Sequence, residues 1–142
     1  MEYVAKVSRS QGQWAIEFPD CNGCVTCGST RDEARMMAAE ALALWLESRL
    51  ENGHVPPRPK YANKNGWAIA VDVSTALALQ LRWLRDDRGL SQGQVAKLAG
   101  VTQQQVARLE RTKSNPTVKT LDLLARALGV RFNGGFELPK AW

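Results

Sequence analysis

A short segment in the second half of the chain carries side chains that could read the edges of DNA bases. The residues of this segment that would remain exposed on a helix are polar or basic: Gln103, Gln104, Gln105, Arg108 and Arg111. In the major groove glutamine can pair with adenine and arginine with guanine, while Lys and Arg at the edges neutralise phosphates. An isolated Gln/Arg-rich helix could equally be a plain solvated face, so the elements that position it decide between the two.

The neighbouring elements predict a helix-turn-helix. Ser91-Gln92-Gly93-Gln94 and Thr102-Gln103-Gln104-Gln105 each match a capping box, in which two side chains satisfy backbone N–H groups at a helix start. Gly100 lies in the intervening turn, and Ala96 is a small residue where the two helices would cross. We expect the shared apolar core to consist of Val95, Leu98, Val101, Val106 and Leu109.

Two further helices flank this pair. One is predicted to begin with Ser74-Thr75 as its cap, to carry Leu77, Leu81 and Leu84 on one stripe, and to end at Gly89. The other begins at Asn115-Pro116-Thr117 and buries Leu121, Leu124, Ala125 and Leu128. The second half is therefore predicted to be all-α, with four to five helices.

The first half of the chain predicts a small sheet with one long helix. Alternating apolar residues favour strands over 3–7 and 14–18, joined in a hairpin, and a third short strand around Cys24–Cys27. Thr30-Arg31-Asp32-Glu33 caps a long helix, and Trp67 to Val73 returns to the sheet as a fourth strand. The predicted fold class is α+β, with a βββαβ domain over residues 1–73 and a helix-turn-helix domain over residues 74–142.

The two halves of the chain also differ in charge. Residues 1–75 hold eight Lys and Arg against nine Asp and Glu, whereas residues 76–142 hold eleven against five. The basic excess of the second half agrees with an anionic partner. No run approaches the roughly 18 apolar residues of a membrane span, and the N-terminus lacks a secretory signal pattern. We therefore expect a cytoplasmic protein with no membrane partner.

Residues 77–130 resemble the Cro/phage-repressor (Xre-type) DNA-binding domain. The resemblance is carried by Leu90-Ser91-Gln92, Val95-Ala96, Gly100-Val101-Thr102-Gln103, Arg108-Leu109-Glu110 and Asn115-Pro116. It implies that Gln92 touches a phosphate, that the first turn of the recognition helix and Arg108 read bases, and that Glu110 pairs with Arg85 in a structural role. The expected DNA-contacting set is Gln92, Thr102, Gln103, Gln104, Gln105, Arg108, Arg111 and Lys113.

Residues 2–59 resemble the HicB antitoxin domain. The resemblance is carried by the Tyr3–Val7 strand, Gly12-x-Trp14-x-Ile16-x-Phe18-Pro19-Asp20, Gly23-Cys24, Gly28-x-Thr30, Glu33-Ala34 and the prolines at 56, 57 and 59. It implies a fold similar to a degenerate ribonuclease H, without catalysis or cofactor. Such a domain binds and masks a small HicA-type endoribonuclease toxin.

Two other chemistries are open to the first half. A two-metal nuclease needs converging carboxylates, and the candidates are Glu2, Glu17, Asp20, Glu33, Glu40 and Asp72. We expect Glu17 to face solvent and Asp20 to form turn hydrogen bonds, which disfavours an enzyme. A zinc site could use Cys21, Cys24, Cys27 and His54. An extended backbone would put Cys24 on the opposite face from the other two cysteines, so we expect thiols without a metal, in a reducing compartment.

These observations predict an antitoxin that neutralises a HicA-type toxin and represses its own operon. A palindromic operator calls for a homodimer, and pairing of dimers into a tetramer is left open. The alternative is an Xre-type regulator whose N-terminal domain senses a ligand or only oligomerises. Four tryptophans, Trp14, Trp45, Trp67 and Trp83, are expected in the core, and Trp142 either against a neighbouring subunit or outside the fold.

Overall fold

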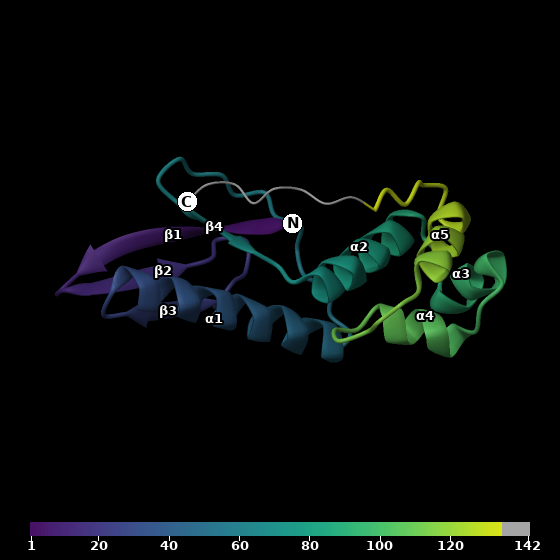
Figure 1. Cartoon of the computed structure of the whole chain (residues 1–142), viewed down its shortest axis with the longest axis horizontal. Helices are drawn as coiled ribbons and strands as arrows, with labels where there is room; N and C mark the ends of the chain where they lie inside the picture. The colour runs from purple at the N-terminus through teal and green to yellow at the C-terminus, as the bar shows by residue number, and fades with distance from the viewer. Residues whose placement is uncertain (135–142) are drawn as a thin grey trace.

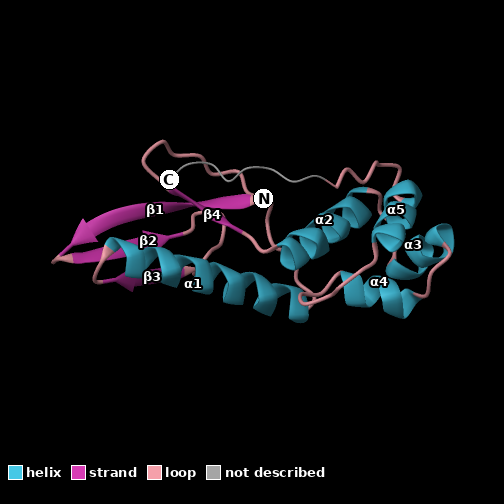
Figure 2. Ribbon diagram, in the orientation of Figure 1, coloured by secondary structure: helices cyan, strands magenta, loops and turns pink. Residues whose placement is uncertain are grey.

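The computed structural model describes residues 1–134, which contain four strands and five helices. The strands are β1 (Glu2–Ser10), β2 (Gln13–Glu17), β3 (Val25–Gly28) and β4 (Trp67–Ala70). The helices are α1 (Arg31–Glu51), α2 (Val73–Asp87), α3 (Gln92–Ala99), α4 (Gln103–Leu109) and α5 (Val118–Ala127). The sheet and α1 form one end of the molecule and α3 to α5 the other, with α2 between them (Figures 1 and 2). The predicted α+β class is confirmed.

The four strands form one antiparallel sheet in the order β3-β2-β1-β4. Strand β1 changes partner along its length, because residues 2–5 pair with β4 and residues 6–10 pair with β2. The predicted hairpin and returning fourth strand are therefore present. The third strand begins at Val25, one residue later than predicted, because the backbone N–H of Cys24 donates to the carbonyl of Cys21 (2.8 Å) in the preceding turn.

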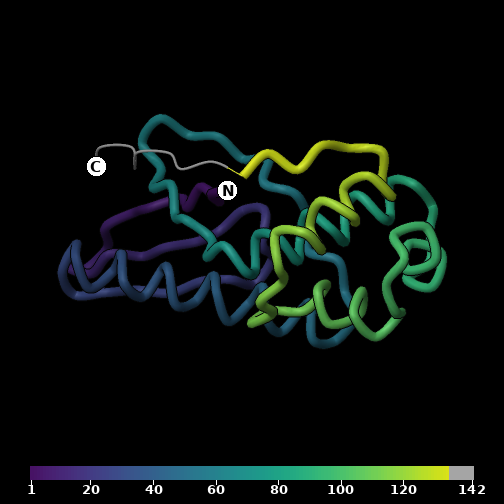
Figure 3. Tube along the Cα trace, turned by 45° about the vertical axis from the view of Figure 1, so that its right-hand side comes forward, coloured from purple at the N-terminus to yellow at the C-terminus, as the bar shows by residue number. Residues whose placement is uncertain are grey.

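Helix α1 lies along one face of this sheet (Figure 3). Its inner side consists of Ala34, Ala38, Leu42 and Leu46, which are buried in one cluster with apolar side chains of the strands. The helix approaches the sheet closely at Gly28, where an added Cβ would lie 2.5 Å from the backbone nitrogen of Ala34. The opposite face of the sheet bears exposed residues such as Glu17, Val25 and Cys27.

Helix α2 begins earlier than predicted. Asp72 is its N-cap and accepts a hydrogen bond from the backbone N–H of Thr75 (3.0 Å). Ser74 was expected to share the cap, but its hydroxyl donates to the carbonyl of Ser114, 40 residues away (3.0 Å). Strand β4 accordingly ends at Ala70, not at Val73.

Helix α2 contributes side chains to both hydrophobic cores. Ala78, Leu79 and Trp83 pack with the sheet and α1, whereas Leu81 and Leu84 pack with α3, α4 and α5. Residues on both sides of the predicted boundary at residue 73 therefore share one core.

The four tryptophans that were predicted to be buried all belong to the core shared by the sheet and α1. Trp67 and Trp83 are buried, Trp14 and Trp45 are partly buried against the first core, and Trp142 lies outside the described residues. The indole N–H of Trp83 donates to the carbonyl of Pro56 (2.7 Å), so its polar atom is satisfied within that core. Among residues 1–134, no helix is long and apolar enough to span a bilayer.

Candidate DNA-binding surface

Helices α3 and α4 each start with a complete capping box, as predicted. The Ser91 hydroxyl accepts from the backbone N–H of Gln94 (3.1 Å), and the Gln94 side chain accepts from the N–H of Ser91 (2.8 Å). Thr102 and Gln105 repeat this arrangement at α4, at 3.1 and 2.9 Å. Gly100 ends α3 with a φ of 70°, a left-handed conformation that glycine adopts at little cost. These local bonds fix the two helices around a short turn.

The core between the two helices differs from the prediction at Leu98. Val95, Val106 and Leu109 are buried and Val101 packs against them, but the Leu98 side chain is 62% exposed. The crossing is made by Ala96 and Ala99, which are both buried. Because these small residues face the partner helices, Leu98 falls on the solvent side of α3.

The outer face of α4 presents the predicted polar set. Thr102, Gln103, Gln104, Gln105, Arg108 and Arg111 are all exposed. The side-chain oxygen of Gln105 accepts a hydrogen bond from the backbone N–H of Thr102 in the cap of α4. The side-chain oxygen of Gln103 lies beside Gly93 of α3, 3.6 Å from the position that a Cβ on this glycine would take. Within the described part of the chain, the side chains of Gln104, Arg108 and Arg111 form no hydrogen bond or ion pair. They are therefore oriented to solvent and available to a ligand.

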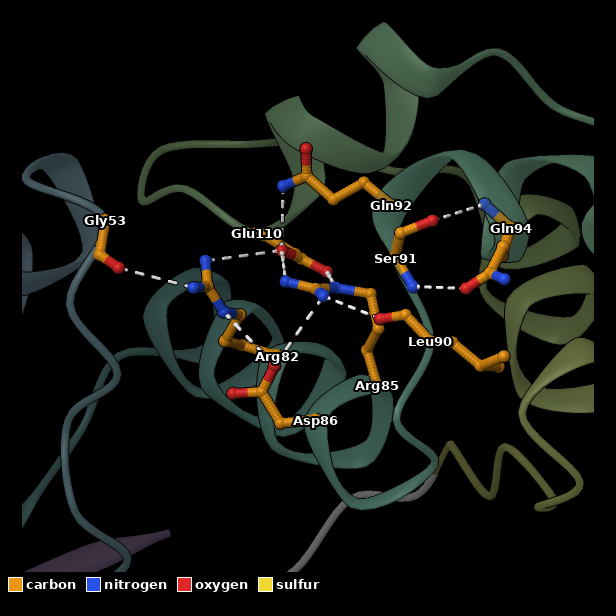
Figure 4. Close-up of polar contacts among 9 residues, drawn as sticks. All are labelled: Gly53, Arg82, Arg85, Asp86, Leu90, Ser91, Gln92, Gln94 and Glu110. Carbon is orange, nitrogen blue, oxygen red and sulfur yellow. Dashed lines mark hydrogen bonds and ion pairs between the residues drawn. The ribbon is translucent and has the colours of Figure 1, made fainter.

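A buried ionic network holds the C-terminal end of α4 (Figure 4). The carboxylate of Glu110, which is 3% exposed, accepts two hydrogen bonds from the guanidinium of Arg85, at 2.5 and 2.9 Å. A third N–H of Arg85 donates to the carbonyl of Leu90 (2.8 Å), at the start of α3. The hydrogen bonds from Arg85 to Glu110 raise the pKa of the guanidinium. Through these three hydrogen bonds Arg85 joins α2 to the start of α3 and to the end of α4.

Gln92 belongs to this network as well as to the outer surface. Its amide nitrogen donates one hydrogen bond to Glu110 (2.9 Å). An amide nitrogen has two N–H donors, so one remains for a phosphate oxygen. The structure therefore orients Gln92 through Glu110 at the start of α3.

Arg82 is a member of the network that was not predicted. Its guanidinium lies 3.6 Å from Glu110 and donates to the carbonyl of Gly53 at the end of α1 (3.3 Å). Arg82 precedes Arg85 by three residues, so the two share one side of α2. This spacing was the signal in the sequence that could have identified it.

Lys113 lies apart from the other candidates. It has a φ of 62° in the loop after α4, and its ammonium pairs with the carboxylate of Glu47 in α1. This pairing raises the pKa of Lys113. The side chain remains 80% exposed, so the contact connects the recognition-helix loop to α1 at the surface.

The candidate carboxylates of the first half have separate structural settings, and within residues 1–134 they form no cluster that could hold a metal ion. Asp20 accepts two hydrogen bonds from the backbone N–H groups of Lys60 and Tyr61, both at 2.8 Å. This differs from the expected turn bond, because Asp20 ties a loop 40 residues away. Glu17 is exposed on the sheet, while Glu33 and Asp72 cap helices.

The cysteines also differ from the expected arrangement. The chain turns between Phe18 and Cys24, so Cys21 and Cys24 are both buried and Cys27 is the exposed one. Burial raises the pKa of Cys21 to about 12 and that of Cys24 to about 11. No group of three or more His, Cys, Asp or Glu side chains within residues 1–134 could hold a metal ion.

Comparisons with known proteins agree with this two-part architecture. A family model for the HicB-like antitoxin of bacterial toxin-antitoxin systems matches residues 3–74, half of the chain. The chain belongs to this antitoxin family. A helix-turn-helix model matches residues 81–134. This HicB-family antitoxin therefore carries a DNA-binding regulator module after its antitoxin domain.

Individual relatives extend over one or both parts. Antitoxin HicB 2 of Photorhabdus laumondii is 28% identical over 129 residues, which cover 91% of each chain. Antitoxin HicB of Escherichia coli K12 is 26% identical over 84% of this chain and 86% of its own. An HTH-type transcriptional regulator of Sinorhizobium fredii is 51% identical over 60 residues, 42% of this chain and 78% of its own. The first two relatives match most of the chain, while the third matches over a much shorter segment.

Proposed function

We propose that this antitoxin binds and neutralises a HicA-type endoribonuclease toxin and represses its own operon by binding operator DNA. The observation that carries the repressor role is the outer face of α4, where Gln104, Arg108 and Arg111 extend to solvent above a network that fixes the helix. These side chains have the chemistry that reads base edges and neutralises phosphates in the major groove. The protein would act in the cytoplasm, where bacterial DNA lies.

The contacts divide into two kinds. Gln104 and Arg108, with Gln103 beside them, would reach base edges, and Gln92, Thr102, Gln105 and Arg111 would contact the backbone. Lys113 would join the backbone contacts when it is released from Glu47. Arg85 and Glu110 would not touch DNA but would hold the helices that do. A homodimer would place two α4 helices about 34–36 Å apart, one turn of duplex, on a two-fold operator.

The proposed toxin binding is supported by membership of the HicB-like antitoxin family and by the hydrophobic core of the sheet and α1. The sheet and α1 form a well-packed unit in which Asp20 ties a loop and Glu33 caps α1. Such a unit has the character of a binding module. The partner would be a HicA-type toxin encoded beside the antitoxin gene.

Co-expression with the neighbouring gene, followed by purification and a mass measurement, tests whether the antitoxin binds the toxin. We expect one complex of defined stoichiometry, in which RNA cleavage by the toxin is suppressed. If the two products form no complex and cleavage is unchanged, the toxin assignment is wrong. The chain would then be a regulator whose N-terminal part has another role.

Measurements of operator affinity test the proposed repressor role. Arg108→Ala should weaken binding to the preferred site by roughly 1–3 kcal/mol and reduce its preference over other sites, whereas Gln92→Ala should weaken all sites alike. Arg9→Ala is a matched control, because it also removes one exposed guanidinium but lies in β1, at the other end of the molecule (Figure 1). Unchanged affinity of the Gln104→Ala/Arg108→Ala double variant would overturn the assignment of α4.

A further inference from the structure

The solvent side of α1 carries large apolar side chains. The helix buries its inner side against the sheet, yet Met36 is 64% exposed and Leu44 is 66% exposed. They lie on one outward row of residues spaced three or four apart, which therefore share a side of the helix. This row, called here the outer stripe of α1, consists of Glu33, Met36, Glu40, Leu44, Glu47 and Glu51.

The charges of α1 are sorted by side. Every charged residue of the outer stripe is a glutamate. The arginines of α1 instead lie over tryptophan rings at its flanks, with guanidinium carbons 5.9 Å (Arg31) and 4.6 Å (Arg35) from the centre of Trp67, and 4.8 Å (Arg49) from that of Trp45. Cation–π contact holds the positive groups at these positions. The outer stripe is thus acidic and apolar together.

This combination selects one kind of occupant. A nucleic acid would be repelled by the glutamates. A second copy docking symmetrically would bring two rows of glutamates together, and like charges across an interface cost several kcal/mol. A protein with a basic surface and apolar spots is complementary, and proteins that act on RNA carry such basic surfaces.

We propose that the outer stripe of α1 is the docking surface for a basic, RNA-binding protein. This inference rests on the proposed function, within which the partner is the toxin. Glu40 and Glu51, which form neither the α1 cap nor the pair with Lys113, would contact the cations that otherwise bind RNA phosphates, while Met36 and Leu44 would bury apolar area at the centre of the contact. Binding at this surface would then exclude RNA from the toxin by direct competition.

The test uses the full chain and the product of the neighbouring gene. Glu40→Lys reverses one charge at the middle of the stripe without touching Glu33, which caps α1, or Glu47, which pairs with Lys113. We expect it to weaken the complex about tenfold or more at low salt and to reduce the salt dependence of association. Met36→Ala/Leu44→Ala should weaken the complex to a similar extent, with an unchanged salt dependence.

Matched controls lie on the opposite face of the sheet. Glu17→Lys makes the same charge change, and Val25→Ala removes part of a side chain that is also 64% exposed; the two residues are cross-strand neighbours. We expect both to bind like the unmodified chain. All substituted positions are exposed, and circular dichroism with a thermal melt checks that each variant is folded.

Three results would contradict the docking surface, and a fourth would contradict the proposed function on which it rests. If the unmodified chain binds the toxin and the α1 variants bind equally well, the surface is wrong although the function stands. If the Glu17 and Val25 variants lose binding instead, the toxin docks on the sheet. If Met36→Ala/Leu44→Ala changes the mass of the free protein in solution, the stripe contacts a second copy. No binding by the unmodified chain would overturn the proposed function itself.

Discussion

Removing the Glu110 carboxylate should destabilise the DNA-binding part more than any surface change. Glu110→Ala deletes the acceptor of two hydrogen bonds from Arg85, at 2.5 and 2.9 Å, and leaves that guanidinium in a site where its side chain is only 11% exposed. Gln92 loses its acceptor as well. Removing one partner of a buried pair costs about 3–5 kcal/mol. The more exposed Asp86, 3.6 Å from the Arg85 guanidinium, offsets only part of this cost.

This cost can be compared with the whole stability of a domain. Native domains have free energies of unfolding of about 5–15 kcal/mol, so the variant should lose a large part of its margin. For a chain of this size about 3 °C of Tm corresponds to 1 kcal/mol, which predicts a Tm lower by roughly 10–15 °C. Urea unfolding followed by circular dichroism measures the free energy directly.

A double variant separates the cost of an unpaired charge from the value of the pair. On one side the Arg85–Glu110 pair faces apolar side chains, namely Leu81, Val95, Val106, Leu109, Leu124 and Leu128, and on the other it contacts Arg82, Asp86 and Gln92. In such a site Arg85→Met/Glu110→Leu can recover most of the loss, and we expect it within about 1–2 kcal/mol of the unmodified protein. If Glu110→Ala alone costs under about 1 kcal/mol, or if the double variant is no more stable than the single one, the reasoning about the buried network is refuted.

Three other perturbations act elsewhere in the molecule. Asp20→Ala removes the acceptor for the backbone of residues 60–61 and should cost about 1–3 kcal/mol, measured by urea unfolding, whereas Asp20→Asn should recover part of it. The pKa values of Cys21 and Cys24 are raised to about 12 and 11 in the folded state, from 9.0. Only the unfolded thiols ionise between pH 9 and about 11, so Tm should fall as the pH rises through this range, and fall less in Cys21→Ala. Glu47→Gln releases Lys113 for a phosphate, so the salt slope of operator binding should steepen by about one unit, while Glu40→Gln leaves it unchanged.

Elements with local signals were predicted well from the sequence. Both capping boxes of the helix-turn-helix depend on residues three apart, and Gly100 ends α3 as expected. The alternation of the first strands also identified their inward faces, because Tyr3, Ala5 and Ile16 are buried together. These features are set by neighbours in the chain, so spacing alone determines them.

Features that depend on distant contacts were missed. Asp72 caps α2 instead of Ser74, because Ser74 bonds to the carbonyl of Ser114, which no local pattern indicates. Leu98 was assigned to the core by its size and spacing, yet a close helix crossing favours Ala96 and Ala99. In both cases tertiary contacts decide which residue caps the helix or is buried, and they override the local preference.

The shared helix α2 places two oppositely charged surfaces on one body. The outer face of α4 and the residues just after it carry Arg108 and Arg111, whereas the outer stripe of α1 is acidic; α1 begins under the sheet and its C-terminal end reaches the loop after α4 (Figure 1). Lys113 and Glu47 meet at the junction between them and neutralise each other there. Since charges are screened beyond about 8 Å at physiological salt, Glu33 and Glu40 do not weaken the field at α4, whereas Glu47 removes one positive charge beside it by pairing with Lys113. The acidic stripe also repels a duplex that approaches α1. DNA is therefore directed to α4 alone, and a basic protein to α1.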